Sequence, residues 1–142
     1  MRILFDTDVI LDLLLDREPF NATAAWLVNR VHTGELEGFI SAITLTTIFY
    51  LARKAVGNKR ARSYIEDLLK IFQVALVNKA VLETALALPI KDYEDAVQHA
   101  SAELAGAEGI VTRNVPDFKQ ATLKVYTPVE LRAVLETLAD DQ

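Results

Sequence analysis

A short apolar run that ends on an acid near the N-terminus constrains the fold more than any other feature of this chain. Residues 3–5 (Ile-Leu-Phe) are unbroken and apolar, and the run is too short for a helix. Such a run is typical of a strand buried on both faces of a parallel sheet. Asp6 follows directly and Asp8 comes two residues later. Because open α/β sheets bind ligands beyond the carboxyl ends of their strands, we expect these acids at a functional edge.

Further short apolar runs alternate with stretches of helical periodicity along the rest of the chain. This alternation predicts an α/β fold, a three-layer sandwich with a five-stranded, mainly parallel sheet and helices on both faces. The length of 142 residues suits a single domain over residues 1–142. Strands are expected at 3–5, 38–41, 74–77, 109–112 and 124–126, and helices at 9–15, 20–33, 45–56, 59–72, 79–88, 92–105 and from 128 onwards.

The composition excludes several kinds of site. The chain has no cysteine and only two histidines, His32 and His99, so thiolate and multi-histidine metal sites are excluded. Any metal would be held mainly by oxygen, which favours Mg²⁺ or Mn²⁺. A net charge of −5 disfavours broad electrostatic binding of nucleic acid but is compatible with a local basic groove. With no apolar run of membrane-spanning length and no signal-peptide pattern, we expect a cytoplasmic protein.

Acidic residues with catalytic potential occur in three places. Asp6 and Asp8 follow the first strand, and Asp117 follows the fourth. Asp92 and Asp95 begin the helix at 92–105, where residues three or four apart share a face. On that helix we expect one polar stripe, made of Asp92, Asp95, His99 and Glu103.

Each acid also has a purely structural interpretation. Asp6, Asp8 or Asp92 could be no more than a helix N-cap, since aspartate is favoured there. Asp117 belongs to an Asn-Val-Pro-Asp turn. If the first and fourth strands are neighbours, however, Asp6, Asp95 and Asp117 converge, and clustered carboxylates repel one another. A divalent cation removes that repulsion and can promote phosphodiester hydrolysis.

Three segments resemble the signatures of PIN domains, the metal-dependent ribonuclease domains found in bacterial VapC-type toxins. They are Phe-Asp-Thr-Asp-Val-Ile-Leu-Asp at 5–12, Asp-Tyr-Glu-Asp-Ala at 92–96 and Val-Thr-Arg-Asn…Asp-Phe at 111–118. The resemblance spans nearly the whole chain. It implies a five-stranded parallel sheet, hydrolysis of RNA with Mg²⁺ or Mn²⁺, a small antitoxin partner and a homodimer.

The resemblance also implies roles for individual residues. Asp6 becomes the central metal ligand and Asp95 a second ligand, while Asp117 holds or orients the metal-bound water. Asp8 lies where many relatives carry asparagine, and Asp92 becomes a peripheral acid. Hydrogen bonds that support the site are expected from Thr112 and Asn114.

One position departs from the family pattern. Most PIN nucleases carry a glutamate early in the helix after the second strand, and residues 41–50 contain no acid. Thr47 occupies the place that corresponds to the glutamate. Asp8 and Asp92 are the candidates for restoring the missing charge. The alternative to a ribonuclease is therefore a PIN-fold module that binds RNA or a protein without cutting.

Basic residues cluster on this otherwise acidic chain. They form either a solvated helix junction or a rim that contacts RNA phosphates. Arg113, beside the acids, is the better single candidate for a phosphate contact. The cluster comprises Arg53, Lys54, Lys59, Arg60 and Arg62.

A phosphatase of the haloacid-dehalogenase type is the remaining alternative. Its Asp-x-Asp opening resembles residues 6–8, with the first aspartate as nucleophile. Those enzymes usually continue with Gly-Thr, whereas Val9-Ile10 follow here. The Thr-Arg-Asn…Asp-Phe segment is also foreign to them.

Overall fold

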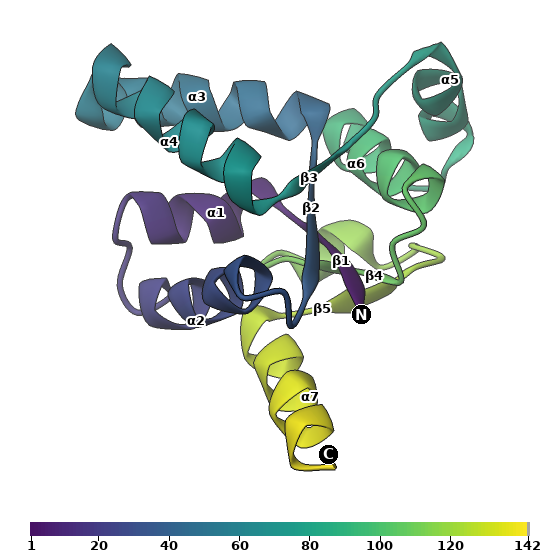
Figure 1. Cartoon of the computed structure of the whole chain (residues 1–142). Helices are drawn as coiled ribbons and strands as arrows, with labels where there is room; N and C mark the ends of the chain where they lie inside the picture. The colour runs from purple at the N-terminus through teal and green to yellow at the C-terminus, as the bar shows by residue number, and fades with distance from the viewer. Residues whose placement is uncertain (142) are drawn as a thin grey trace.

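The computed structural model describes residues 1–141 and contains one five-stranded sheet (Figure 1). The strand order is β3-β2-β1-β4-β5, and all four neighbouring pairs are parallel. The predicted sheet is therefore confirmed, and it is parallel throughout. The strands are β1 (Arg2–Phe5), β2 (Glu37–Ser41), β3 (Gln73–Ala75), β4 (Gly109–Val111) and β5 (Lys124–Tyr126).

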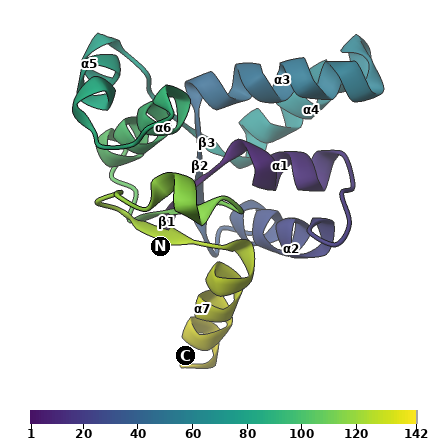
Figure 2. The ribbon, with the colours of Figure 1, turned by 180° about the vertical axis from the view of Figure 1, so that it is seen from behind.

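Helices cover both faces of the sheet, which gives the predicted three-layer sandwich (Figures 1 and 2). One face packs against α1 (Thr7–Leu14), α2 (Asn21–His32), α3 (Ala42–Val56), α4 (Asn58–Ile71) and the start of α7 (Pro128–Asp140). The other face packs against α5 (Lys79–Ala87) and α6 (Tyr93–Leu104). A short 3₁₀ helix, η1 (Val115–Phe118), follows β4.

The central strand β1 contributes to both cores. Ile3 and Phe5 belong to the core under α1 to α4, whereas Leu4 belongs to the core under α5 and α6. Successive side chains of a strand point to opposite faces, so a strand covered on both sides must be apolar throughout. All three side chains are fully buried. This burial is the physical reason for the apolar run at the N-terminus.

Local signals mark several helix boundaries correctly. Thr127 and Glu130 form a capping box at the start of α7, and Gly34, with φ +84°, follows the C-cap of α2. The third strand was predicted at 74–77 but lies at 73–75. Leu76 is 60 % exposed, so its apolar side chain does not indicate a buried strand. Hydropathy alone therefore placed this strand too late in the sequence.

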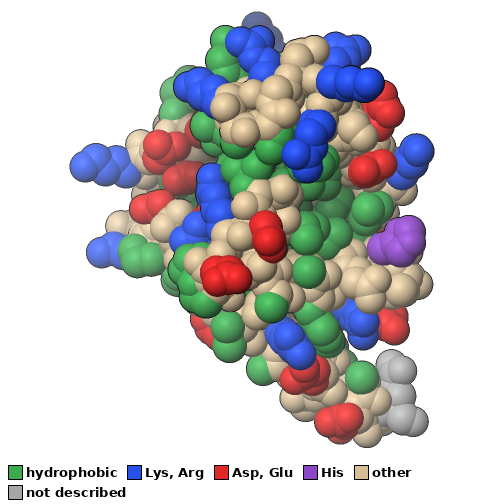
Figure 3. Space-filling view, turned by 90° about the vertical axis from the view of Figure 1, so that its left-hand side faces the viewer, with side chains coloured by type: hydrophobic (Ala, Val, Ile, Leu, Met, Phe, Trp, Pro, Cys, Tyr) green, Lys and Arg blue, Asp and Glu red, His purple; other side chains and the backbone are tan. Residues whose placement is uncertain are grey.

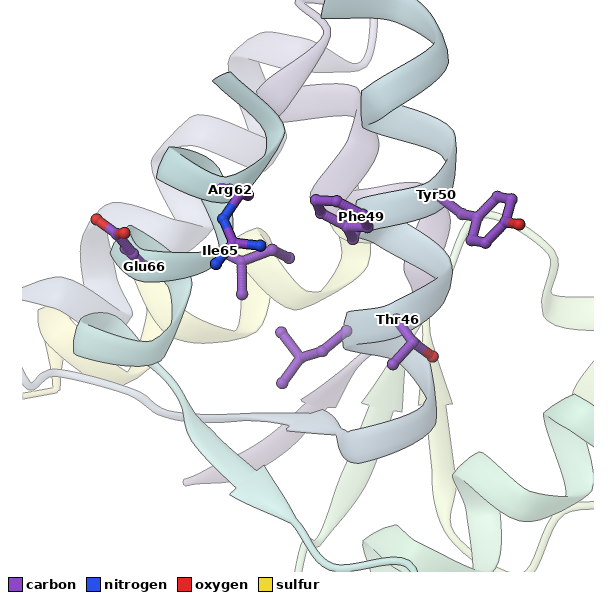
Figure 4. Close-up of a pocket in the computed structure, with 7 residues that line it drawn as sticks. Thr46, Phe49, Tyr50, Arg62, Ile65 and Glu66 are labelled. Carbon is purple, nitrogen blue, oxygen red and sulfur yellow. The ribbon is translucent and has the colours of Figure 1, made fainter. Parts of the chain in front are cut away.

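The helices α3 and α4 lie side by side and extend away from the sheet (Figures 1 and 2). A groove of about 510 Å³ lies between them. Figure 4 shows Phe49 of α3 facing Arg62 and Ile65 of α4. Within residues 1–141, no helix combines the length and apolar character that crossing a membrane requires.

Candidate active site

A cleft of about 340 Å³ lies beyond the carboxyl ends of β1 and β4. These two strands are neighbours, with Phe5 paired to Val111, so the residues that follow them meet. Residues from α1, α3, α6 and η1 complete the walls. The cleft is lined by Asp6, Thr7, Asp8, Leu11, Arg17, Leu51, Asp92, Glu94, Asp95, Gln98, Asn114 and Asp117.

Asp6 is held by three neutral donors. Its Oδ1 accepts hydrogen bonds from the backbone N–H of Thr7 (2.7 Å) and from Nε2 of Gln98 (2.9 Å). Its Oδ2 accepts one from Oγ1 of Thr112 (2.7 Å). Asp6 is therefore the N-cap of α1, as its structural interpretation predicted, and it also lines the cleft. The side chain is only 6 % exposed and its orientation is fixed.

The carboxyl groups in the cleft repel one another. Burial raises the pKa of Asp95 to about 7, and the charges of Asp6, Asp92, Asp117 and Glu94 add to the increase. Burial and the charge of Asp6 raise the pKa of Asp8 to about 6. Both increases oppose ionisation, because a carboxylate is disfavoured by low polarity and by like charge. The acids that the sequence placed in three segments thus form one electrostatic cluster.

A second set of hydrogen bonds supports the acids. The backbone N–H of Asn114 donates to Oγ1 of Thr112 (2.9 Å), and Nδ2 of Asn114 donates to Oδ2 of Asp8 (2.8 Å). Thr112 and Asn114 therefore make hydrogen bonds of the kind the resemblance implied. Asp92 caps α6 by accepting from the backbone N–H of Asp95 (3.0 Å).

The donor set suits a hard divalent cation. The acidic side chains of the lining offer only oxygen atoms. Three buried side-chain atoms of cleft residues, Oγ1 of Thr7, Oδ1 of Asp8 and Oε1 of Gln98, have no hydrogen-bond partner in the part of the chain that the structure describes. Within residues 1–141, no three acidic or histidine side chains are already arranged to hold an ion.

Arg113 does not point into the cleft. Its Nε lies 2.6 Å from Oδ2 of Asp12 and its Nη2 lies 3.1 Å from Oδ1, and the guanidinium stacks over Phe20. These bonds to Asp12 raise the pKa of Arg113. The basic side chain that lines the cleft is Arg17, which sequence reasoning missed because it lies in a loop without a motif.

The predicted basic cluster lies on α3 and α4, away from the cleft lining. Lys and Arg side chains are prominent over these helices at the top of Figure 3. The guanidinium groups of Arg53 and Arg60 lie over the rings of Tyr50 and Tyr64. The structure does not bring Arg53, Lys54, Lys59, Arg60 or Arg62 into the cleft lining.

Thr47 lies behind the cleft rather than in its lining. Its Oγ1 lies 3.3 Å from Oε1 of Glu94 and 3.3 Å from the backbone carbonyl of Ile43. Glu94 does line the cleft, and so does Gln98 one helical turn later. Sequence reasoning missed both residues. The signal was available, because Gln98 is three residues after Asp95 and four after Glu94, on a shared face of α6.

The expected polar stripe on α6 divides into two environments. His99 is fully buried, and its Nε2 accepts from the backbone N–H groups of Thr122 (3.1 Å) and Leu123 (3.3 Å). Its Nδ1 faces Glu103 at 3.0 Å. Burial lowers the pKa of His99, and Glu103 opposes that change. Asp92 and Asp95 therefore line the cleft, whereas His99 and Glu103 do not.

The parallel sheet and the acidic cleft at its carboxyl edge define an α/β protein with an oxygen-rich candidate metal centre. The sequence profile of a family described as PIN domain matches residues 2–116. The chain belongs to the PIN domain family. This assignment replaces the haloacid-dehalogenase alternative.

Individual relatives are similar over most of their length. Ribonuclease VapC1 of Aquifex aeolicus (strain VF5) is 24 % identical over 134 residues, which are 91 % of this chain and 92 % of that protein. A chain of a toxin–antitoxin complex from Klebsiella pneumoniae is 26 % identical with a TM-score of 0.69, covering 89 % of this chain and 97 % of that one. Mycobacterium tuberculosis VapC20, a sarcin-ricin loop cleaving toxin, is 18 % identical with a TM-score of 0.62, covering 76 % and 86 %.

Proposed function

We propose that this chain is a divalent-metal-dependent ribonuclease and the toxin of a toxin–antitoxin pair. The observation that carries the proposal is the fixed, buried carboxylate of Asp6 at the centre of a cluster whose acids oppose one another's ionisation. Crowded carboxylates that destabilise a protein are retained where function requires them. The similarity to a ribonuclease of Aquifex aeolicus supports RNA as the substrate.

In this proposal, Asp6, Asp95 and Asp117 hold Mg²⁺ or Mn²⁺. The cation supplies charge neutralisation at the scissile phosphate and lowers the pKa of water. Gln98 and Thr112 orient Asp6 through the hydrogen bonds described above. Asn114 orients Asp8, and Asp92 stays at the periphery as the cap of α6. Arg17, whose Nη1 lies 3.9 Å from Oδ1 of Asp12, is the basic side chain of the lining that would contact an RNA phosphate.

The test is cleavage of generic single-stranded RNA with Mg²⁺ or Mn²⁺. Asp6→Asn should reduce the rate by about 100-fold or more, because several kcal/mol of charge stabilisation depend on the cation. Asp67→Asn, which removes an acid from α4 outside the cleft lining, should cut at the wild-type rate. RNA binding without cleavage would favour the alternative, a PIN-fold module that binds without cutting.

An antitoxin is the proposed protein partner, since the Klebsiella pneumoniae relative comes from a toxin–antitoxin complex. The groove between α3 and α4 offers an apolar surface with Arg62 at its wall. Phe49→Asp should weaken binding of a small protein that relieves the toxicity of the chain. Leu86→Asp, an equally large change at a 74 % exposed position of α5, should not. A homodimer and a cytoplasmic location complete the proposal.

A further inference from the structure

We infer that the carboxylate of Glu94 serves the divalent cation in place of the acid that α3 lacks at position 47. This inference rests on the proposed metal-dependent function. It concerns a residue of α6, whereas the family pattern led us to look for the charge on α3 or at Asp8 and Asp92. The observation behind it is the contact between Thr47 and Glu94 across two helices.

The first argument is the position of Glu94. Oγ1 of Thr47 lies 3.3 Å from Oε1 of Glu94, so the carboxylate on α6 contacts the Thr47 side chain on α3. Leu51, one turn later on α3, lines the cleft, so this face of α3 is directed toward it. A glutamate at position 47 would extend into the region that the Glu94 carboxylate already occupies. The two positions therefore deliver a carboxylate to the same wall of the cleft.

The second argument is the bonding of Glu94. Within residues 1–141, it has no Lys, Arg or His nitrogen within 4.0 Å, and its side-chain hydrogen bond is the long one from Thr47. A threonine hydroxyl has one hydrogen, which here is shared with the carbonyl of Ile43. The half-buried carboxylate of Glu94 thus keeps lone pairs for a ligand.

The side chain of Gln98 supports the same kind of ligand. Gln98 is 1 % exposed and lines the cleft, and its Oε1 is buried without a hydrogen-bond partner. A buried acceptor without a donor is costly unless a ligand or water satisfies it. Gln98 lies four residues after Glu94, on the same side of α6. An oxygen-seeking cation or its water would satisfy both side chains.

The two acids that the sequence suggested make no hydrogen bond to α3 in the described chain. Oδ2 of Asp8 accepts from Asn114 while its Oδ1 has no hydrogen-bond partner there, and Oδ1 of Asp92 caps α6. Neither of them makes a hydrogen bond to Thr47, within residues 1–141, whereas Glu94 does. Glu94 is therefore the acid best placed to fill the role that position 47 leaves empty.

The test is calorimetric titration of the full chain with Mn²⁺, with the Mn²⁺-induced rise in melting temperature as a second readout. Glu94→Gln keeps the size and the acceptor for Thr47 and removes only the charge. It should weaken Mn²⁺ binding by roughly 10- to 100-fold, the usual cost of losing a carboxylate that supports a metal ion. Glu83→Gln, on exposed α5, is the matched control and should bind as wild type.

A charge relocation sharpens the test. The double variant Thr47→Glu with Glu94→Gln returns a carboxylate to the same wall from α3, so it should recover affinity to within about threefold of wild type. If the double variant binds Mn²⁺ as weakly as Glu94→Gln does, the two positions are not equivalent and the inference is wrong.

The remaining outcomes separate this inference from the proposed function. If Asp6→Asn abolishes the Mn²⁺ response and Glu94→Gln leaves it unchanged, the inference about Glu94 is wrong and the metal-dependent function stands. If wild type itself shows no Mn²⁺ response, the proposed metal dependence fails, and the inference fails with it.

Discussion

Asp6 and Asp12 are two buried aspartates six residues apart at the two ends of the same short helix, yet their environments are opposite. Asp12 is 1 % exposed and makes a bidentate ion pair with Arg113. Asp6 is 6 % exposed, accepts only from neutral donors and adds to the repulsion on Asp8 and Asp95. One buried charge is neutralised within the fold and the other is not.

The difference indicates which acid is structural and which is available to a ligand. A buried charge is tolerated when it is paired and hydrogen-bonded, as Asp12 is. A buried carboxylate that is held in place but surrounded by other acids is not neutralised within the fold, so an external cation can bind to it. The comparison also accounts for Arg113, which was predicted to contact a phosphate because it follows the acids in sequence, but whose guanidinium binds Asp12.

The largest change in stability is expected at the paired aspartate. Arg113→Ala leaves Asp12 buried and without its bidentate partner. It should reduce the free energy of unfolding by roughly 2–3 kcal/mol, which is less than the usual cost of a broken buried pair, because the Arg113 side chain is 27 % exposed and Nη1 of Arg17 stays 3.9 Å from Oδ1 of Asp12. Urea denaturation measures this loss. Lys79→Ala, which breaks an exposed pair with Glu83, should change stability by no more than about 0.5 kcal/mol.

A double variant tests whether the effect of Arg113 comes from Asp12. Asp12→Asn combined with Arg113→Ala removes the uncompensated charge as well as its partner. It should be more stable than Arg113→Ala alone, since an unpaired buried charge costs more than a neutral polar group. If the two variants unfold at the same urea concentration, the charge of Asp12 does not govern stability at this end of α1.

Removing the charge of the clustered Asp6 should increase the stability of the metal-free protein. In chelator, Asp6→Asn retains an acceptor for Thr7 and Gln98 and removes the repulsion on Asp8 and Asp95. We expect a gain of about 1 kcal/mol, or about 3 °C in melting temperature for a domain of this size. Thermal melts of the metal-free proteins measure it. Identical melting of wild type and Asp6→Asn would contradict the clustering.

The metal-free protein should also show a pH-dependent stability. The pKa of Asp95 rises from 3.8 in the unfolded chain to about 7 in the fold, and that of Asp8 rises to about 6. The folded state therefore binds more protons, so the metal-free protein should lose stability as pH rises from about 4 to about 7. Urea denaturation in chelator across this range should show a shallower loss for Asp95→Asn. Equal slopes would show that Asp95 is not the group that titrates.

Local sequence was sufficient for the sheet and for the backbone of the site. Residues 3–5 are apolar because β1 is covered on both faces, and the acid after the strand caps the next helix. Asp92 and Thr127 cap helices as their sequence signals predicted. These features depend on a few consecutive residues, so a single sequence reveals them. The shared edge of Asp6 and Asp117 also followed, once β1 and β4 were taken as neighbours.

Only the tertiary structure decided which side chains the acids contact. Arg113 reaches Asp12 across 101 positions, Gln98 reaches Asp6 across 92, and Thr47 meets Glu94 across 47. His99 shares a helix with Asp95 but turns toward Thr122. A motif specifies the type of residue at a position, whereas its partner depends on how helices pack on the sheet. Whether a buried carboxylate is paired depends on that packing, which is why the sequence did not show that Asp12 pairs with Arg113 while Asp6 accepts only from neutral donors.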